Sequence, residues 1–92
     1  MKESTRDKGR RILAAMLTGR KITPFEANKI GETTEGTRFI RLFRERYPIR
    51  DEKVDGERYH KYWIDEEFIK SWKAGGVKVY CGGVEIRTNL AV

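Results

Sequence analysis

The chain has 92 residues, which is enough for one small hydrophobic core and too few for two. Charged residues make up 37% of it, and its ten aromatic residues argue against a disordered chain. The single cysteine, Cys81, excludes an internal disulfide and a zinc site built from cysteines.

The net charge of +6 is unevenly distributed along the chain. Residues 1–50 carry 13 lysines and arginines against 6 acids, whereas residues 51–92 carry 7 against 8. A localised basic surface attracts polyanions, and the release of condensed counterions favours nucleic-acid binding. A role in solubility explains the charge about equally well, so charge alone does not decide the partner.

Several function classes lack their signatures. No apolar run approaches the ~18 residues that span a membrane, and the first residues lack the apolar region of a signal peptide, so we expect a cytoplasmic protein. One histidine, His60, excludes most histidine metal sites, and no cofactor is expected. Neither His60 nor Cys81 lies in a nucleophile motif, and no phosphate-binding glycine loop is present, so we expect no enzymatic activity.

The first predicted helix follows a polar stretch, residues 1–9, which we expect to fray. It runs to about Thr18 and ends at Gly19, because glycine is common just beyond helix ends. Its apolar residues recur at helical spacing and are Ile12, Leu13, Met16 and Leu17. The next three residues, 20–22, are expected to pair as a short strand.

A second, brief helix has a strong start. Thr23 is a capping residue, Pro24 suits the first helical position, and Glu26 can complete a capping box. The helix is expected to end at Ile30, with Gly31 beyond it. A helix this short must pack against other elements, because it is not stable alone.

A third helix is expected after Thr33 or Thr34, either of which can cap it. Gly36 weakens its first turn by roughly 1 kcal/mol relative to alanine, and it lets backbone approach a large partner closely. The expected buried stripe comprises Ile40, Phe43 and Tyr47, widened by Phe39 and Leu42. A separate strip carries arginines at every third position, namely Arg38, Arg41 and Arg44.

The remaining residues predict two hairpins around a helix. Residues 49–54 and 57–64 read as strands joined by a turn at Asp55-Gly56. The acids at 65–67 favour a helix start, since they suit the positive end of the helix dipole, and Gly75-Gly76 ends that helix. Residues 77–80 and 84–87 alternate as a second hairpin.

The order of these elements resembles the winged helix-turn-helix fold over about Arg11–Ile64. Ala27, Ile30, Gly31 and Ile40 match positions of the helix-turn-helix pattern, although Glu32 and Thr37 stand where apolar residues are usual. The chain looks like a small phage or prophage helix-turn-helix family, marked by an Ile-x-x-Leu-Arg helix and a Pro-Ile hairpin. Here Phe43-Arg44 and Pro48-Ile49 stand at the two hallmark positions.

The resemblance implies an α+β winged helix-turn-helix over residues 1–64, consisting of three helices and a hairpin wing. Residues 65–92 would form a helix-hairpin extension packed on it as one globular unit. It also implies a regulatory protein that binds double-stranded DNA in a bacterial host cell, with the third helix in the major groove. Implied base contacts are Thr33, Thr34, Thr37, Arg38 and Arg41. Implied backbone contacts are Arg20, Lys21, Lys29, Arg44, Lys53 and Arg58.

Two alternatives remain. The first reads the arginine strip as an ordinary exposed helix face, with Glu35 and Glu45 as ion-pair partners, and we favour DNA contact over it. The fold can also serve as a phage-encoded module that modulates a host protein, which the acidic wing and the aromatic-bearing extension favour. A homodimer through the C-terminal hairpin is a further possibility, because an unpaired strand edge invites pairing.

Overall fold

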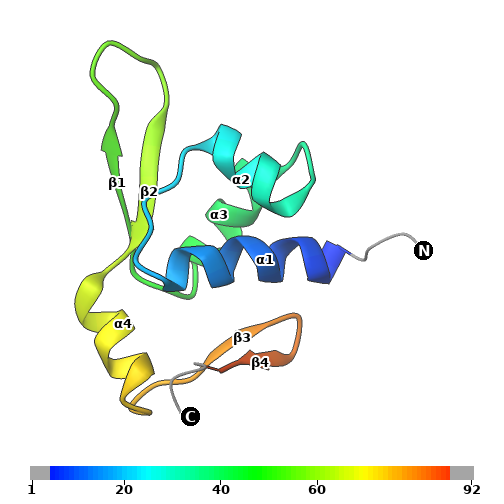
Figure 1. Ribbon diagram of the computed structural model, residues 1–92, viewed down its shortest axis with the longest axis vertical. Helices are drawn as coiled ribbons and strands as arrows, with labels where there is room; N and C mark the ends of the chain where they lie inside the picture. Colours follow the sequence, from blue (N-terminus) through cyan, green and yellow to red (C-terminus); the bar gives the residue numbers. More distant parts are fainter. Residues whose placement is uncertain (1–4, 88–92) are drawn as a thin grey trace.

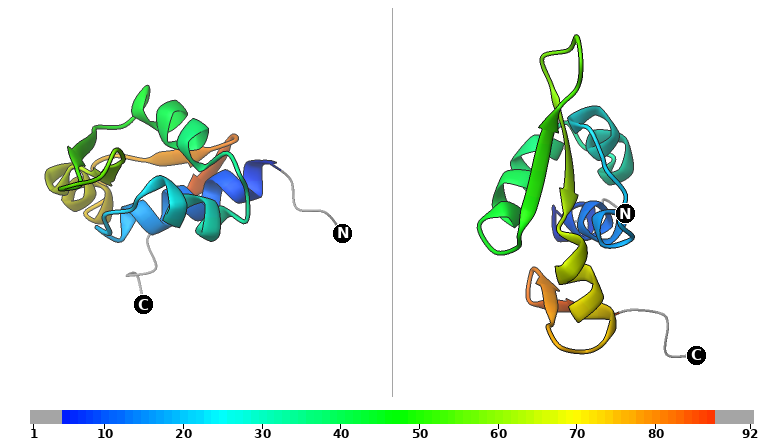
Figure 2. Two further views of the ribbon diagram at one scale, coloured as in Figure 1. Left: turned by 90° about the horizontal axis from the view of Figure 1, so that it is seen from above. Right: turned by 90° about the vertical axis from the view of Figure 1, so that its left-hand side faces the viewer.

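The computed structural model describes residues 5–87, which form a small α+β fold of four helices and two antiparallel hairpins (Figure 1). The elements in chain order are α1 (Thr5–Leu17), α2 (Pro24–Gly31), α3 (Gly36–Arg44), β1 (Ile49–Lys53), β2 (His60–Ile64), α4 (Glu66–Lys73), β3 (Val79–Cys81) and β4 (Val84–Ile86). The β1–β2 hairpin projects beyond the helices at one end. Helix α4 and the β3–β4 hairpin lie at the other end, with α1 between (Figures 1 and 2).

One hydrophobic core includes residues from the first three helices and the first hairpin as well as from α4 and the second hairpin. Its completely or almost completely buried side chains are Ile12, Leu13, Met16, Leu17, Ile22, Ile40, Ile64 and Val79. Ile69 of α4 and Cys81 of β3 belong to the same cluster. The C-terminal elements therefore contribute to the core that α1 and α3 form.

Helix α1 begins at Thr5, so the expectation that residues up to 9 fray is wrong for the described residues 5–9. Residues 1–4 lie outside the described part of the chain. Gly9 is buried, and a Cβ there would stand 3.0 Å from the ring of Phe39. The glycine therefore lets α1 approach α3 closely. Gly19, with φ of 90°, follows the helix end as predicted.

The predicted capping box of α2 is confirmed. The Thr23 hydroxyl accepts from the Glu26 backbone N–H, and the Glu26 carboxylate accepts from the Thr23 N–H at 3.0 Å. The predicted end is one residue early, since the left-handed residue is Glu32, with φ of 50°. Gly31 stays in the helix, where a Cβ would come within 2.8 Å of Ile12.

The turn between α2 and α3 differs from the prediction in its cap. Neither Thr33 nor Thr34 caps α3, whose N-cap residue is Glu35 and makes no side-chain capping bond. The side chain of Asn28 on α2 instead accepts from the Gly36 N–H at 2.7 Å. The close backbone approach of Gly36 is also made within the chain, to Ala27 and Asn28, rather than to a partner.

Helix α3 buries the predicted stripe with one exception. Ile40, Phe43 and Phe39 are buried, and Tyr47 beyond the helix is partly buried. Leu42 was expected to widen the stripe but is 49% exposed, so that expectation is wrong. Leu42 lies on the flank of α3 that faces β3, where a groove remains open.

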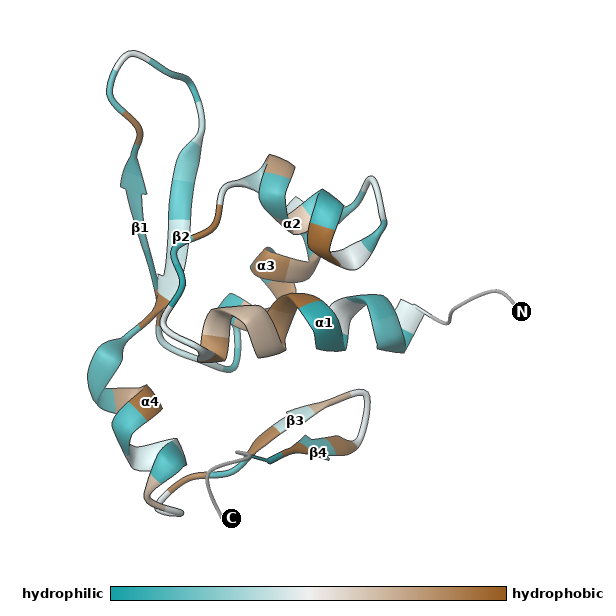
Figure 3. Cartoon of the chain, viewed as in Figure 1, coloured by the Kyte–Doolittle hydropathy of each residue, from teal (hydrophilic) through white to brown (hydrophobic). Residues whose placement is uncertain are grey.

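The first hairpin pairs Ile49 with Ile64 at its base and Lys53 with His60 at its far end. Its loop spans residues 54–59, so the expected two-residue turn and the strand over 57–59 are wrong. The predicted short strand before α2 is confirmed as a single bridge, because Ile22 exchanges backbone hydrogen bonds of 2.9 and 2.7 Å with Tyr62. Hydrophilic residues run along most of the hairpin (Figure 3).

The second hairpin is confirmed and turns at Gly82 and Gly83, both with positive φ. Its strands are shorter than predicted, since residues 77, 78 and 87 lie outside them, and Cys81 belongs to β3 instead of the turn. Two side chains attach it to the rest of the molecule. Trp72 of α4 donates from Nε1 to the Ile86 carbonyl at 3.0 Å. The Tyr47 hydroxyl donates to the Tyr80 carbonyl at 2.8 Å and accepts from its N–H at 2.9 Å.

Candidate nucleic-acid interface

The outward arc of α3 carries polar and cationic side chains. At about 3.6 residues per turn, Arg38 and Arg41 lie opposite the buried residues Gly36, Ile40 and Phe43. Both arginines are exposed. Within the described residues Arg38 forms one ion pair, with Glu35 at 3.5 Å; both side chains are well exposed, and such pairs contribute little to stability. Arg41 has no ion pair or side-chain hydrogen bond within residues 5–87.

The three threonines predicted at base edges have different environments. Thr37 is exposed in the first turn of α3, and Thr34 is exposed in the turn before it. Thr33 is partly buried, and its hydroxyl accepts from the Glu35 N–H at 3.1 Å. Thr34, Thr37, Arg38 and Arg41 are therefore available to a ligand, whereas Thr33 also stabilises the turn.

Two of the predicted backbone cations are engaged within the chain. Arg20 donates to Glu26 at 3.0 Å, and this guanidinium, after the Thr23 backbone bond, helps lower the pKa of Glu26 below its ordinary value of 4.5. The Lys21 ammonium lies 4.4 Å from the ring centroid of Trp63. Both side chains are exposed, so neither contact removes the charge from solvent.

Three other predicted backbone cations are exposed and have no ion pair within residues 5–87. Lys29 lies on α2, Lys53 ends β1, and Arg58 is in the hairpin loop. The same hairpin also exposes Glu52, Asp55 and Glu57. Lys61 of β2 is exposed as well and lines the same shallow hollow as Lys53, Glu52 and Asp55. The outer part of the hairpin therefore carries cations and acids side by side and is not a continuous basic surface.

Arg44 links α3 to the hairpin. Its guanidinium donates to one oxygen of Asp51, and the other oxygen lies 2.7 Å from Nδ1 of His60. These bonds, led by the one from Arg44, lower the pKa of Asp51 below its ordinary value. Arg44 thus fixes the hairpin against the C-terminal end of α3, and its charge is partly balanced by the Asp51 carboxylate. This ion pair was not predicted from the sequence.

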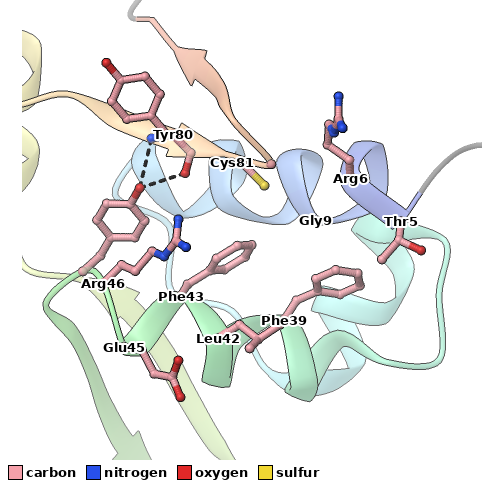
Figure 4. A pocket seen from close by; sticks show the side chains of 12 residues that line it. Thr5, Arg6, Gly9, Phe39, Leu42, Phe43, Glu45, Arg46, Tyr80 and Cys81 are labelled. Carbon is pink, nitrogen blue, oxygen red and sulfur yellow. Dashed lines mark hydrogen bonds between the residues drawn. The ribbon is translucent and has the colours of Figure 1, made fainter.

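A groove borders α3 on the flank that carries Leu42 and was not predicted from sequence (Figure 4). It has a volume of about 270 Å³ and lies between the start of α1, the second half of α3 and β3. Its lining includes Gly9, Phe39, Phe43, Leu42, Tyr80 and Cys81. The only sequence signal was an apolar residue, Leu42, next to the arginine strip.

Cys81 is a buried free thiol at the wall of this groove. Burial raises the pKa of the thiol, and the opposing charges of Arg10, Arg46 and Arg6 offset this only in part. The thiol is therefore neutral at pH 7, and it does not balance the positive charge around the groove.

An aromatic pair is exposed beside the β1–β2 hairpin. Phe25 of α2 is 64% exposed, and its ring meets Tyr59 edge to face with 5.0 Å between centroids. An apolar side chain in a helix this short is expected to pack against other elements. The structure places it at the surface, where it is the most exposed large hydrophobic side chain among the described residues.

None of the helices between residues 5 and 87 has the length and apolar content needed to cross a bilayer. In the same part of the chain, no three His, Cys, Asp or Glu side chains gather in a way that would hold a metal ion.

Comparison with known proteins gives no match, whether with protein-family models, with curated proteins or with solved structures.

Proposed function

We propose that this chain is a winged helix-turn-helix protein that binds double-stranded DNA with α3 in the major groove. The observation that carries the proposal is the outward arc of α3, where Arg38 and Arg41 stand opposite the buried stripe. Arginine bonds two acceptors of guanine in the major groove, and exposed Thr37 and Thr34 suit base edges or thymine methyl groups.

The surrounding elements support the same arrangement. Helices α2 and α3 are joined by a tight turn, and the β1–β2 hairpin follows α3 as a wing with Ile22 bridged to it. Lys29 on α2 and Lys53 and Arg58 on the hairpin are three exposed cations suited to phosphates. Arg44, engaged by Asp51, positions the wing, and we propose a regulatory role in a phage or prophage.

A titration of labelled duplex DNA tests the proposal by fluorescence anisotropy. With about three phosphate contacts, a fourfold rise in salt from about 50 mM is expected to weaken binding roughly 40-fold. Enrichment from a random duplex pool then identifies the preferred sequence. Lys78→Ala, which removes an exposed cation just before β3, at the end of the molecule opposite the β1–β2 hairpin, serves as control and should leave affinity unchanged.

A second candidate function is docking of a host protein on the wing, favoured by exposed Phe25, which packs on partly buried Tyr59, and by the acids of the hairpin loop. Exposed aromatics are common anchors in protein interfaces. The same titration separates the two candidates, since an absence of duplex binding at low salt would overturn the DNA proposal and favour this one.

A further inference from the structure

The groove between α1, α3 and β3 combines an apolar interior with positive charge at its border. Phe39 and Phe43 point into it from α3, and the sulfur of Cys81 faces them from β3 (Figure 4). Leu42 forms an apolar rim, being 49% exposed, whereas the ring of Tyr80 points away from the groove on the other face of β3 (Figure 4). The volume of about 270 Å³ lies just below the roughly 300–1,000 Å³ of drug-sized sites, so it suits a smaller ligand.

Two arginines border the groove. Arg46 extends across it towards β3, whereas Glu45, the acid beside it, extends away from β3 (Figure 4). The aliphatic part of Arg6 lies against Gly82, where a Cβ would come within 2.5 Å of Cγ. Neither Arg6 nor Arg46 has an ion pair or side-chain hydrogen bond within residues 5–87.

We propose that this groove binds a small organic anion with a flat apolar body and one carboxylate. The body lies against Phe39, Phe43 and the Leu42 side chain, and the carboxylate accepts hydrogen bonds from the Arg46 guanidinium. A guanidinium fork matches a carboxylate with two parallel bonds, and a pair flanked by apolar walls is less screened than one in water. This site goes beyond DNA binding and does not depend on it.

The occupant follows from the charge and shape of the groove. A neutral apolar molecule would not pair with the Arg46 guanidinium, and an inorganic anion would leave the exposed Leu42 side chain uncovered. A second copy of the chain is the competing occupant, since Leu42 and Tyr80 are also suited to an interface. The experiment below distinguishes a second copy from a small anion.

The test is a titration of the ¹⁵N-labelled full chain with 2-naphthoate, followed by amide NMR shifts, with neutral 2-naphthamide as the matched probe. We expect saturable shifts confined to the groove, at Gly9, Leu42 and Gly82, and at least fivefold weaker binding of the amide. Equal affinity for the two probes, or shifts spread over the whole chain, would overturn the proposal. So would groove shifts that depend on protein concentration without any probe, because they indicate a second copy.

Two variants localise the carboxylate. Arg46→Gln should weaken naphthoate binding at least fivefold and leave naphthamide binding unchanged. Leu42→Glu, at an exposed position that tolerates a polar side chain, should abolish naphthoate binding by placing a carboxylate at the rim. Arg50→Gln, which removes an exposed arginine from β1, is the control and should bind like the wild type. Unchanged naphthoate affinity in Arg46→Gln would overturn the assignment.

Discussion

The side-chain oxygen of Asn28 accepts a hydrogen bond from the backbone N–H of Gly36, with 2.7 Å between Oδ1 and N. Asn28 lies on α2 and Gly36 is the first residue of α3, so one helix caps the next. This bond fixes the angle between the two helices as well as satisfying an N–H at the start of α3.

Asn28→Ala should therefore lower the free energy of unfolding by about 0.5–2 kcal/mol, the usual cost of losing a cap. The midpoint of thermal unfolding should fall by several degrees. Asn28→Asp keeps the acceptor and places a negative charge near the start of α3, so it should retain stability. If Asn28→Ala and Asn28→Asp are equally destabilised in urea unfolding, the cap is not what stabilises the turn.

Gly36→Ala should be more damaging than an ordinary helix substitution. The added Cβ would meet the Ala27 Cβ at 2.7 Å and the Asn28 backbone nitrogen at 2.9 Å, and the backbone cannot move aside cheaply. We expect a loss of roughly 1–3 kcal/mol, although alanine is the better helix former. Gly76→Ala is the control, because its closest neighbour would be the Ser71 carbonyl at 3.4 Å. Similar urea midpoints for the two variants would contradict the close packing of α2 and α3.

Arg38→Ala and Arg41→Ala test the proposed reading face. Each should weaken binding to the selected duplex by roughly 1–3 kcal/mol, with relaxed preference at the base pair it contacts. The measurement is fluorescence anisotropy on the selected duplex and on a scrambled one. Circular dichroism must show an unchanged fold, which is expected because both side chains are exposed. Loss of affinity that is equal for both duplexes would assign these arginines to phosphates instead of bases.

Asp51→Asn should increase DNA affinity under the proposed function. Removing the carboxylate frees the Arg44 guanidinium for a phosphate, so the slope of log affinity against log salt should steepen by about one. Glu67→Gln on α4 removes the same charge at a distant position and controls for the change in net charge. A decrease in affinity would show that the wing position fixed by Arg44 and Asp51 matters more than the freed charge.

Acid should weaken the start of α2 through Glu26. Its pKa is lowered in the folded state, first by the Thr23 backbone N–H and also by Arg20. The ionised Glu26 side chain therefore stabilises the fold fully at pH values above its ordinary pKa of 4.5. This contribution is lost as the pH falls through the lower pKa of the folded state. The wild type should exceed Glu26→Gln in stability at pH 7, and the difference should shrink near pH 3 in urea unfolding. A difference that does not vary with pH would contradict this role.

The elements that could be predicted from sequence are those whose causes are local. The capping box of α2 was predictable because both of its hydrogen bonds join Thr23 and Glu26, which are three residues apart in sequence. The turn at Gly82-Gly83 was predictable for the same reason, since both glycines adopt positive φ.

The features that could not be predicted depend on contacts between distant segments. The cap of α3 comes from Asn28, eight residues before Gly36, and the nearer Thr33 and Thr34 looked equally suitable. Periodicity grouped Leu42 with the buried stripe, but the width of the covered arc is set by β3, which leaves that flank open. The strip of arginines in the candidate site could be predicted from their spacing. The pairing of Arg44 with Asp51 could not, because it depends on which residues of β1 and β2 lie opposite each other.

The two bonds between Tyr47 and Tyr80 protect an open sheet edge. Among residues 5–87, β4 is the one strand that pairs with β3, so the N–H and C=O of Tyr80 would otherwise be available to a strand from another molecule. A single phenol oxygen, 33 residues away in sequence, occupies both groups. Resistance of this hairpin to aggregation therefore depends on a residue outside it. Loss of the hydroxyl in Tyr47→Phe would leave the backbone groups of Tyr80 free to pair with a strand of another molecule, although no residue of the sheet is changed.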